Sequence, residues 1–237
     1  MAGENTDKRI TQSTGKRGRF IDLSHTIVEG MITYKGFPAP LICDFMSRQA
    51  SKQFYDEGTS FQIGKIEMIA NTGTYLDSPF HRFEEGKDTA DLDLAALASL
   101  EAVLVRTEGM SCTPVDRQVF LSTDVREKAV LVHTGWAKHW RTDQYFEGHP
   151  FLTKAAARYL KEQGAVLVGI DSLNIDDISD GSRPVHTTLL GAGILIVEHL
   201  CNLDQLPVSG FTFSAVPVKV KGMGTFPVRA FATLSTA

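Results

Sequence analysis

The chain has 237 residues, of which 43% are hydrophobic and 22% are charged, and its formal net charge is −4. These values are typical of a globular protein and exclude a disordered or fibrous chain. A net negative charge argues against nucleic acids and membranes as partners, since both need concentrated positive charge, and leaves a small-molecule substrate as the expected partner.

Residues 1–18 are polar and carry a local charge of +2, without the apolar core of a secretory signal. They predict a flexible tail before a single domain at 19–237. The three cysteines, Cys43, Cys112 and Cys201, are widely spaced and odd in number, which favours a reducing compartment over a disulfide framework. The longest apolar run is about half of the ~20 residues needed to span a bilayer. We therefore expect a cytoplasmic protein.

Strand-like and helix-like patterns follow one another along the domain. Residues 20–24 and 61–69 have the alternation of strands, and residues 92–100, rich in Leu and Ala, predict a short helix. The fully apolar runs 102–105 and 129–132 are typical of strands buried on both faces. A later run, 193–197, leads to Glu198, and residues 211–234 contain several short strand-like runs. The pattern predicts an α/β protein with a mixed sheet.

The clearest unit runs from residue 129 to residue 171. A strand ends at His133, Pro150 opens a helix, Gly164 ends that helix, and residues 165–170 form the next buried strand before Asp171. A strand–helix–strand unit of this kind predicts two parallel strands with a right-handed connection. Functional groups in such units gather beyond the carboxyl ends of the strands.

Polar residues that can carry chemistry are concentrated in residues 71–81, which include Asn71, Tyr75, Asp77 and His81. If this segment is extended, Tyr75 and Asp77 point the same way, because side chains alternate with period two. A carboxylate and an imidazole four residues apart could share a metal ion, a water molecule or a substrate.

A second cluster contains His186 and, twelve residues later, Glu198. Together with Asp77, these residues would provide three ligands for Zn²⁺ or Mn²⁺ and leave open positions for a water molecule and a substrate oxygen. The same residues also fit structural roles: Asp77 as a turn or cap residue, His81 as a surface histidine, and Glu198 beside a helix N-terminus. Spacing alone leaves both interpretations open.

The order of these motifs resembles the cyclase family of metal-dependent hydrolases, which includes bacterial kynurenine formamidase and isatin hydrolase. The family hallmark is His-x-Gly-Thr-His-x-Asp-x-Pro-x-His, and residues 71–81 match it as Asn-x-Gly-Thr-Tyr-x-Asp-x-Pro-x-His. Further matches occur at 22–25, 134–136, 169–172, 186–190, 198–203 and 227–230. The resemblance thus extends over about residues 20–232.

This resemblance implies a swivelling β/β/α fold, assembly as a homodimer or homotetramer, and hydrolysis of C–N bonds in amides with a bound divalent metal, commonly Zn²⁺ or Mn²⁺. Asp77, His186 and Glu198 match the ligands of one family metal site, and His81 matches the general acid/base. Asn71 and Tyr75 replace the two histidines that help to hold another metal. A neutral amide and a phenol are poor zinc ligands, so we expect at most one metal ion per chain.

Three functions remain open at this stage. The first is a metal-dependent hydrolase of a small cyclic amide, formamide, ester or lactone, in which His81 is the general acid/base and Tyr75 donates a hydrogen bond to the oxyanion. The second is a metal-free cyclase or dehydratase-type lyase that uses His81 and Tyr75. The third is a non-catalytic binder of small acids. Asn71 and Trp136 are candidate substrate contacts or weak ligands. The aromatic residues of 136–151 fit a flat or aromatic ligand and equally fit packing in the core or at a subunit interface.

Overall fold

The structure is a computed structural model that describes residues 18–107, 109 and 114–234; nearly all of the predicted tail, together with Cys112, lies outside these residues. The strands in the described residues are β1 (Arg19–Asp22), β2 (Leu41–Met46), β3 (Ile63–Glu67), β4 (Tyr75–Asp77), β5 (Leu100–Arg106), β6 (Pro114–Val115), β7 (Ala129–His133), β8 (Phe151–Leu152), β9 (Leu167–Ile170), β10 (Leu195–Glu198), β11 (Phe211–Ser214), β12 (Thr225–Pro227) and β13 (Phe231–Leu234). The α-helices are α1 (Arg48–Ser51), α2 (Lys154–Glu162) and α3 (Pro184–Leu190). Short 3₁₀ turns are η1 (Pro79–His81), η2 (Leu94–Ala96), η3 (Arg117–Phe120), η4 (Trp136–His139), η5 (Asp143–Phe146) and η6 (Leu203–Gln205).

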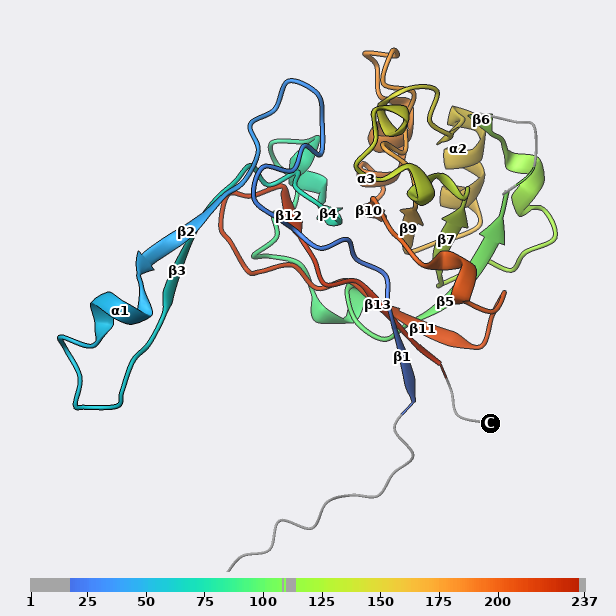
Figure 1. Cartoon of the computed structure of the whole chain (residues 1–237). Helices are drawn as coiled ribbons and strands as arrows, with labels where there is room; N and C mark the ends of the chain where they lie inside the picture. The colour runs from blue at the N-terminus through green and yellow to red at the C-terminus, as the bar shows by residue number, and fades with distance from the viewer. Residues whose placement is uncertain (1–17, 108, 110–113, 235–237) are drawn as a thin grey trace, which may run out of the picture.

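One curled mixed sheet organises the domain, with the strand order β1-β13-β11-β5-β7-β9-β10-β4-β12 among the described residues (Figure 1). Strands β5, β7, β9 and β10 are parallel, whereas the strands on both sides of them pair antiparallel. The predicted α/β class and the mixed sheet are therefore confirmed. The predicted parallel pair is also confirmed, because α2 connects β7 to β9.

The sheet buries both of its faces. Along β5, Val103 and Val105 belong to an apolar cluster that includes residues of α2 and α3. Ala102 and Leu104 belong to a second cluster, which includes residues of β11 and β13. This alternation follows from the period of two in a strand. Strand β7 is buried along its whole length, as its unbroken apolar sequence predicts.

The helix predictions are right in kind but differ at the boundaries. The helix expected to open at Pro150 begins at Lys154, because the hydroxyl of Thr153 caps it by accepting from the backbone N–H of Ala156 at 3.0 Å. Its end at Gly164 is confirmed by a left-handed φ of 82°. The helix expected at residues 92–100 is wrong: a single 3₁₀ turn, η2, forms there, and Leu100 already begins β5.

A two-stranded arm, β2–β3 with α1 at its far end, projects from the sheet (Figure 1). The strand predicted at 61–69 is the second strand of this arm. Large apolar side chains on the arm are exposed, among them Phe45 at 74%, Phe54 at 64% and Phe61 at 52%. An isolated hairpin is marginally stable in water, so this surface needs a covering element.

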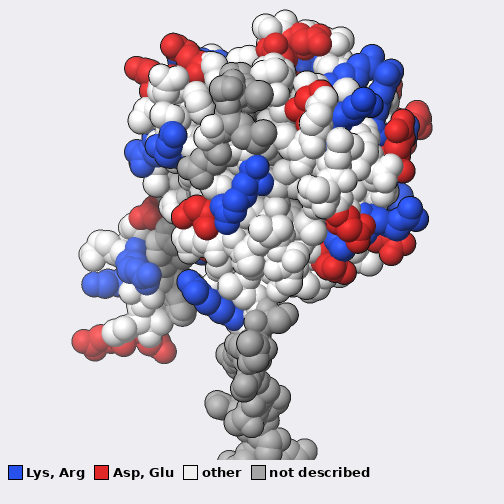
Figure 2. Space-filling model, turned by 90° about the vertical axis from the view of Figure 1, so that its right-hand side faces the viewer, with Lys and Arg blue, Asp and Glu red and all other residues white. Residues whose placement is uncertain are grey.

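The outer surface has mixed charge. On the face in Figure 2, basic and acidic side chains are interspersed, and neither sign forms a continuous area. No helix in the described part of the chain has the length and apolarity to cross a membrane.

Candidate active site

Strand β4 brings the two sequence clusters together. It lies between β10 and β12, and the register places Glu198 opposite Tyr75 and Thr225 opposite Asp77. Directly opposed residues of antiparallel strands project on the same face. Tyr75 and Asp77 also share a face, as predicted, because they are two positions apart. The sheet register therefore brings these four side chains to one place.

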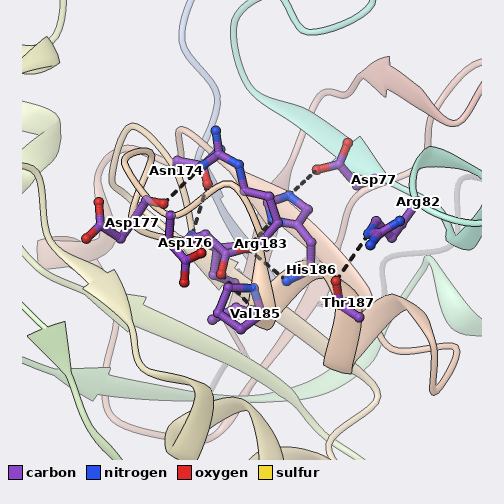
Figure 3. Close-up of polar contacts among 12 residues, drawn as sticks. Asp77, Arg82, Asn174, Asp176, Asp177, Arg183, Val185, His186 and Thr187 are labelled. Carbon is purple, nitrogen blue, oxygen red and sulfur yellow. Dashed lines mark hydrogen bonds and ion pairs between the residues drawn. The ribbon is translucent and has the colours of Figure 1, made fainter.

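His186 is oriented by a carboxylate that follows β9. The Asp176 carboxylate accepts from the backbone N–H groups of Val185 and His186 at 2.7 and 3.0 Å, and it lies 2.6 Å from Nδ1 of His186. Because an ionised carboxylate only accepts, Nδ1 carries the proton. The other ring nitrogen, Nε2, lies 3.6 Å from Asp77 Oδ2 (Figure 3) and 3.8 Å from Glu198 Oε1.

Asp77 is completely buried, and its Oδ2 atom has no hydrogen-bond partner. Its other oxygen, Oδ1, accepts from the hydroxyl of Thr225, whose oxygen lies 2.8 Å from Nδ1 of His81. The single hydroxyl proton of Thr225 is donated to Asp77, so Nδ1 of His81 must be the donor to Thr225. In the neutral form of His81 the lone pair is therefore on Nε2.

Glu198 is also buried, but its oxygens are both satisfied. Oε1 accepts from the backbone N–H of Ile175 at 2.6 Å, and Oε2 accepts from the hydroxyl of Tyr75 at 2.5 Å. The hydroxyl of Tyr34 donates to the Leu173 carbonyl at 2.7 Å and lies 3.1 Å from the hydroxyl of Tyr75. Burial raises the pKa of both phenols well above the usual value. They therefore act as neutral donors, and Tyr75 commits its proton to Glu198.

The carboxylates around His186 set its charge. Burial lowers the pKa of His186, but the hydrogen bond with Asp176 and the nearby carboxylates of Asp77 and Glu198 outweigh it and raise the pKa to about 10. Burial raises the pKa of Glu198 to about 7 in spite of the opposing charge of His186. The site thus concentrates negative charge that either a proton on His186 or a cation can offset.

The donor atoms suit a divalent metal ion. Within the described residues, one ligand atom each from Asp77, His81 and His186 lies within 4.8 Å of the others. The unpartnered Oδ2 of Asp77 has the character of an open ligand position, since buried polar atoms are otherwise almost always hydrogen-bonded. The Asp176–His186 contact is the carboxylate–imidazole pairing that orients metal-bound histidines. Glu198, the third predicted ligand, adjoins this group through His186.

A cavity of about 270 Å³ opens over these groups. Its lining residues are Tyr34, Phe37, Asn71, Tyr75, His81, Arg82, Asn174, Arg183, His186 and Glu198. Asn71 thus lies where a substrate contact was expected. Trp136 is not among the lining residues, and its indole N–H donates to the carbonyl of Tyr145 at 3.0 Å. A flat ligand would instead meet Tyr34 and Phe37.

Several residues of the site escaped sequence reasoning. Asn174 and Asp176 follow the buried strand β9, and polar residues at such a strand end are a usable signal. Thr225 has no comparable signal, because it belongs to no polar cluster in the sequence. Its place depends on strand register.

Comparisons with known proteins identify the family of the chain. Residues 21–177 match the family model described as Cyclase, putative cyclase. A kynurenine formamidase from Geobacillus thermodenitrificans is 31% identical over 175 residues, which are 73% of this chain and 81% of that protein.

Solved structures share the fold. A potential metal-dependent hydrolase with cyclase activity is 25% identical, with a TM-score of 0.76 over 92% of this chain and 99% of the other. Isatin hydrolase A from Labrenzia aggregata, bound to benzyl benzoate, has a TM-score of 0.78 at 22% identity, over 92% of this chain and 94% of the other.

Proposed function

This chain belongs to the cyclase family, and from that premise we propose that it is a metal-dependent hydrolase of C–N bonds in small amides, including formamides and lactams. The observation that carries the proposal is the buried Oδ2 of Asp77, which has no hydrogen bond and lies 3.6 Å from Nε2 of an oriented His186. The names of the relatives, a kynurenine formamidase and a metal-dependent hydrolase, support the same reaction class.

Asp77, His186 and Glu198 would hold the ion. When bound, a divalent metal polarises a carbonyl and lowers the pKa of a water molecule toward neutrality. Asp176 fixes the His186 ring so that Nε2 points at both carboxylates. The peptide N–H of Ile175 and the hydroxyl of Tyr75 hold Glu198 in place.

His81 is the general acid/base. Its Nδ1–H is tied to Thr225, which leaves Nε2 free to take a proton from the attacking water and to return it to the leaving nitrogen. Its side chain is 36% exposed and lines the cavity, so substrate can approach it. Thr225, hydrogen-bonded to Asp77, is the positioning residue of this histidine.

Tyr75 and Asn71 fill the positions of the two histidines in the family hallmark. The proton of Tyr75 is donated to Glu198, so we assign Tyr75 to positioning of that carboxylate instead of the predicted oxyanion contact. Asn71 lines the cavity and can bind a polar group of the substrate. One metal ion per chain follows, because a phenol that donates to Glu198 is not a ligand.

The proposal is tested by removing and restoring the metal. The chelated protein should lose hydrolysis of aryl formamides and regain it with one equivalent of Mn²⁺ or Zn²⁺. His186→Ala should reduce kcat/KM on the order of 10³-fold or more, since several kcal/mol of stabilisation depend on the ion. His139→Ala, which changes a histidine outside the cavity, is the matched control.

The same experiment separates the alternatives. Full turnover by rigorously metal-free protein would support the lyase or another metal-free mechanism that uses His81. Saturable binding of small acids without turnover in any metal state would support the binding protein. Two equivalents of metal per chain would contradict the single-site assignment.

We also propose that the protein is a homo-oligomer whose subunits meet through the β2–β3 arm. Phe45, Phe54 and Phe61 are exposed on an arm that no other described element covers. A second copy of the chain is the favoured occupant, because symmetric self-association covers two such arms at once. Phe45→Ser combined with Phe54→Ser should shift the sedimentation coefficient to that of a monomer, and an unchanged value would reject this interface.

A further inference from the structure

Two arginines stand at the mouth of the cavity. Arg82 directly follows η1, and Arg183 directly precedes α3. Both line the same cavity as His186, and Figure 3 shows them on either side of this histidine. The two guanidinium groups therefore flank the approach to the proposed reacting centre.

Neither guanidinium has a carboxylate within 4.0 Å among the described residues. Arg82 Nε donates to the hydroxyl of Thr187 at 3.1 Å, and Arg183 Nη1 donates to the carbonyl of Asp177 at 3.2 Å. Arginine carries five N–H donors, so most of those on each group stay available. Arg229 is different, because its guanidinium group donates to both carboxylate oxygens of Asp22, at 2.9 and 2.7 Å.

The acidic residues near Arg183 do not occupy the hydrogen-bond donors of its guanidinium group. The charge of Arg183 contributes to the lowered pKa of Asp180, but the hydrogen bonds from Ser182 are the larger cause. The backbone of Arg183 is held in the left-handed region, with φ 46° and ψ 60°, which is uncommon for a residue other than glycine. Pro184 disfavours the right-handed helical region for the residue before it. The backbone conformation at this position therefore fixes the direction in which the Arg183 side chain begins.

Charge separates the floor of the cavity from its mouth. Asp77 and Glu198 at the floor are offset by a proton on His186 or by the proposed cation, whereas among the described residues no carboxylate within 4.0 Å offsets Arg82 and Arg183, which attract an anion. An anionic substrate would therefore enter in one orientation, with its anionic group at the arginines and its neutral amide toward His186. A guanidinium group matches a carboxylate with two parallel hydrogen bonds.

We propose that Arg82 and Arg183 bind a carboxylate of the substrate, so that the enzyme prefers amides that carry an acid group. This inference rests on the proposed function, because the floor of the same cavity is taken as the reacting centre. It narrows the substrate class from small amides to N-acylated acids. Tyr34 and Phe37 favour a flat group between the two ends.

Paired substrates test the preference. With the Mn²⁺-loaded protein, kcat/KM for the best of the three formamidobenzoate isomers should exceed that for formanilide about tenfold or more. In the double variant Arg82→Gln, Arg183→Gln, that ratio should fall to about one, while kcat/KM for formanilide changes less than about threefold. Arg158→Gln removes an exposed positive charge on α2 and is the matched control.

Direct binding gives a result that does not depend on turnover. In calorimetry, benzoate should bind about tenfold more tightly than benzamide, and the double variant should abolish this difference. A preference for benzoate that persists in the double variant would overturn the inference, since the metal would then be its cause. Arg82→Gln alone, at an exposed position, decides the matter if the double variant does not fold.

The two proposals can fail separately. Equal rates for charged and neutral amides, with no preference for benzoate, would reject the arginine site and leave the hydrolase intact. Arginine-dependent binding of benzoate without hydrolysis of any amide would retain the anion site and reject the proposed function.

Discussion

The two sides of His186 differ in how fully their polar atoms are satisfied. We call Asp77, His81 and Thr225 the aspartate side, and Glu198, Tyr75, Tyr34 and Asn174 the glutamate side. On the aspartate side, Oδ2 of Asp77 is buried without a hydrogen bond. On the glutamate side, each carboxylate oxygen accepts a hydrogen bond of 2.5–2.6 Å. An open buried acceptor suits a cation, whereas the hydroxyl of Tyr75 and the peptide N–H of Ile175 already supply donors to the carboxylate on the other side.

This difference bears on the proposed replacement of two hallmark histidines by Asn71 and Tyr75. In the structure, the hydroxyl of Tyr75 donates to Oε2 of Glu198. A buried carboxylate without such a donor would carry a desolvation cost of several kcal/mol. We therefore expect the replacement to exchange one metal position for a hydrogen-bond network and to leave a single ion held by Asp77, His186 and Glu198. Four predictions, in order of decreasing effect, probe this division.

The largest effect on the aspartate side concerns proton transfer. His81→Ala should lower kcat about 10²–10⁴-fold, because it removes the general acid/base. Thr225→Val should lower kcat by less, since His81 remains but loses the partner that fixes its tautomer. Both variants should keep one equivalent of metal, measured by atomic absorption. Loss of the metal in His81→Ala would instead identify His81 as a ligand, as the grouping of Asp77, His81 and His186 allows.

The second prediction concerns the orientation of His186. Asp176→Asn should weaken metal affinity about 10–100-fold, because it removes the carboxylate that orients the imidazole. Asp143→Asn, which changes an exposed carboxylate outside the cavity, should have no effect. Competitive titration with a metal-binding dye measures both affinities. Equal affinities in the two variants would show that Asp176 has only the capping role at α3.

The third prediction concerns pH. Metal binding must displace the proton from His186, whose pKa is raised to about 10. Affinity should therefore rise up to about tenfold per pH unit between pH 7 and 9. In the metal-free protein the same shift stabilises the fold fully below the ordinary pKa of 6.5, and the stabilisation is lost as pH rises through about 10. A metal affinity that is constant across this interval would contradict the assigned charge of His186.

The smallest effect on catalysis is expected on the glutamate side. Tyr75→Phe removes the donor to Oε2 of Glu198 and should cost about 1–3 kcal/mol in the free energy of unfolding. Metal content should stay at one equivalent, and kcat should change only a few-fold. Tyr159→Phe on α2 is the matched control, and urea denaturation provides the measurement. A loss of metal in Tyr75→Phe would identify the phenol as a ligand and contradict its assignment as a donor to Glu198.

Sequence reasoning identified the segments of the site but not their arrangement. Asp77, His81, His186 and Glu198 were recognised from motif order, and the cavity gathers three of them with Asp77 directly beneath. The short helix expected at 92–100 failed because composition could not reveal the left-handed φ of 56° at Ser99, just before β5. Sequence reasoning predicted only one strand of the apolar arm, at 61–69. Its partner, β2, was missed because its sequence has no regular alternation of apolar and polar residues.

The sequence by itself determined the family, the α/β class and the buried parallel strands, because each is a local pattern or an order of motifs. The tertiary structure decided which groups share protons. Register placed Glu198 opposite Tyr75 and Thr225 opposite Asp77, and the turn before α3 set Arg183 across His186 from Arg82. These contacts join residues more than a hundred positions apart, and a shift of one residue in register would turn the side chains to the other face.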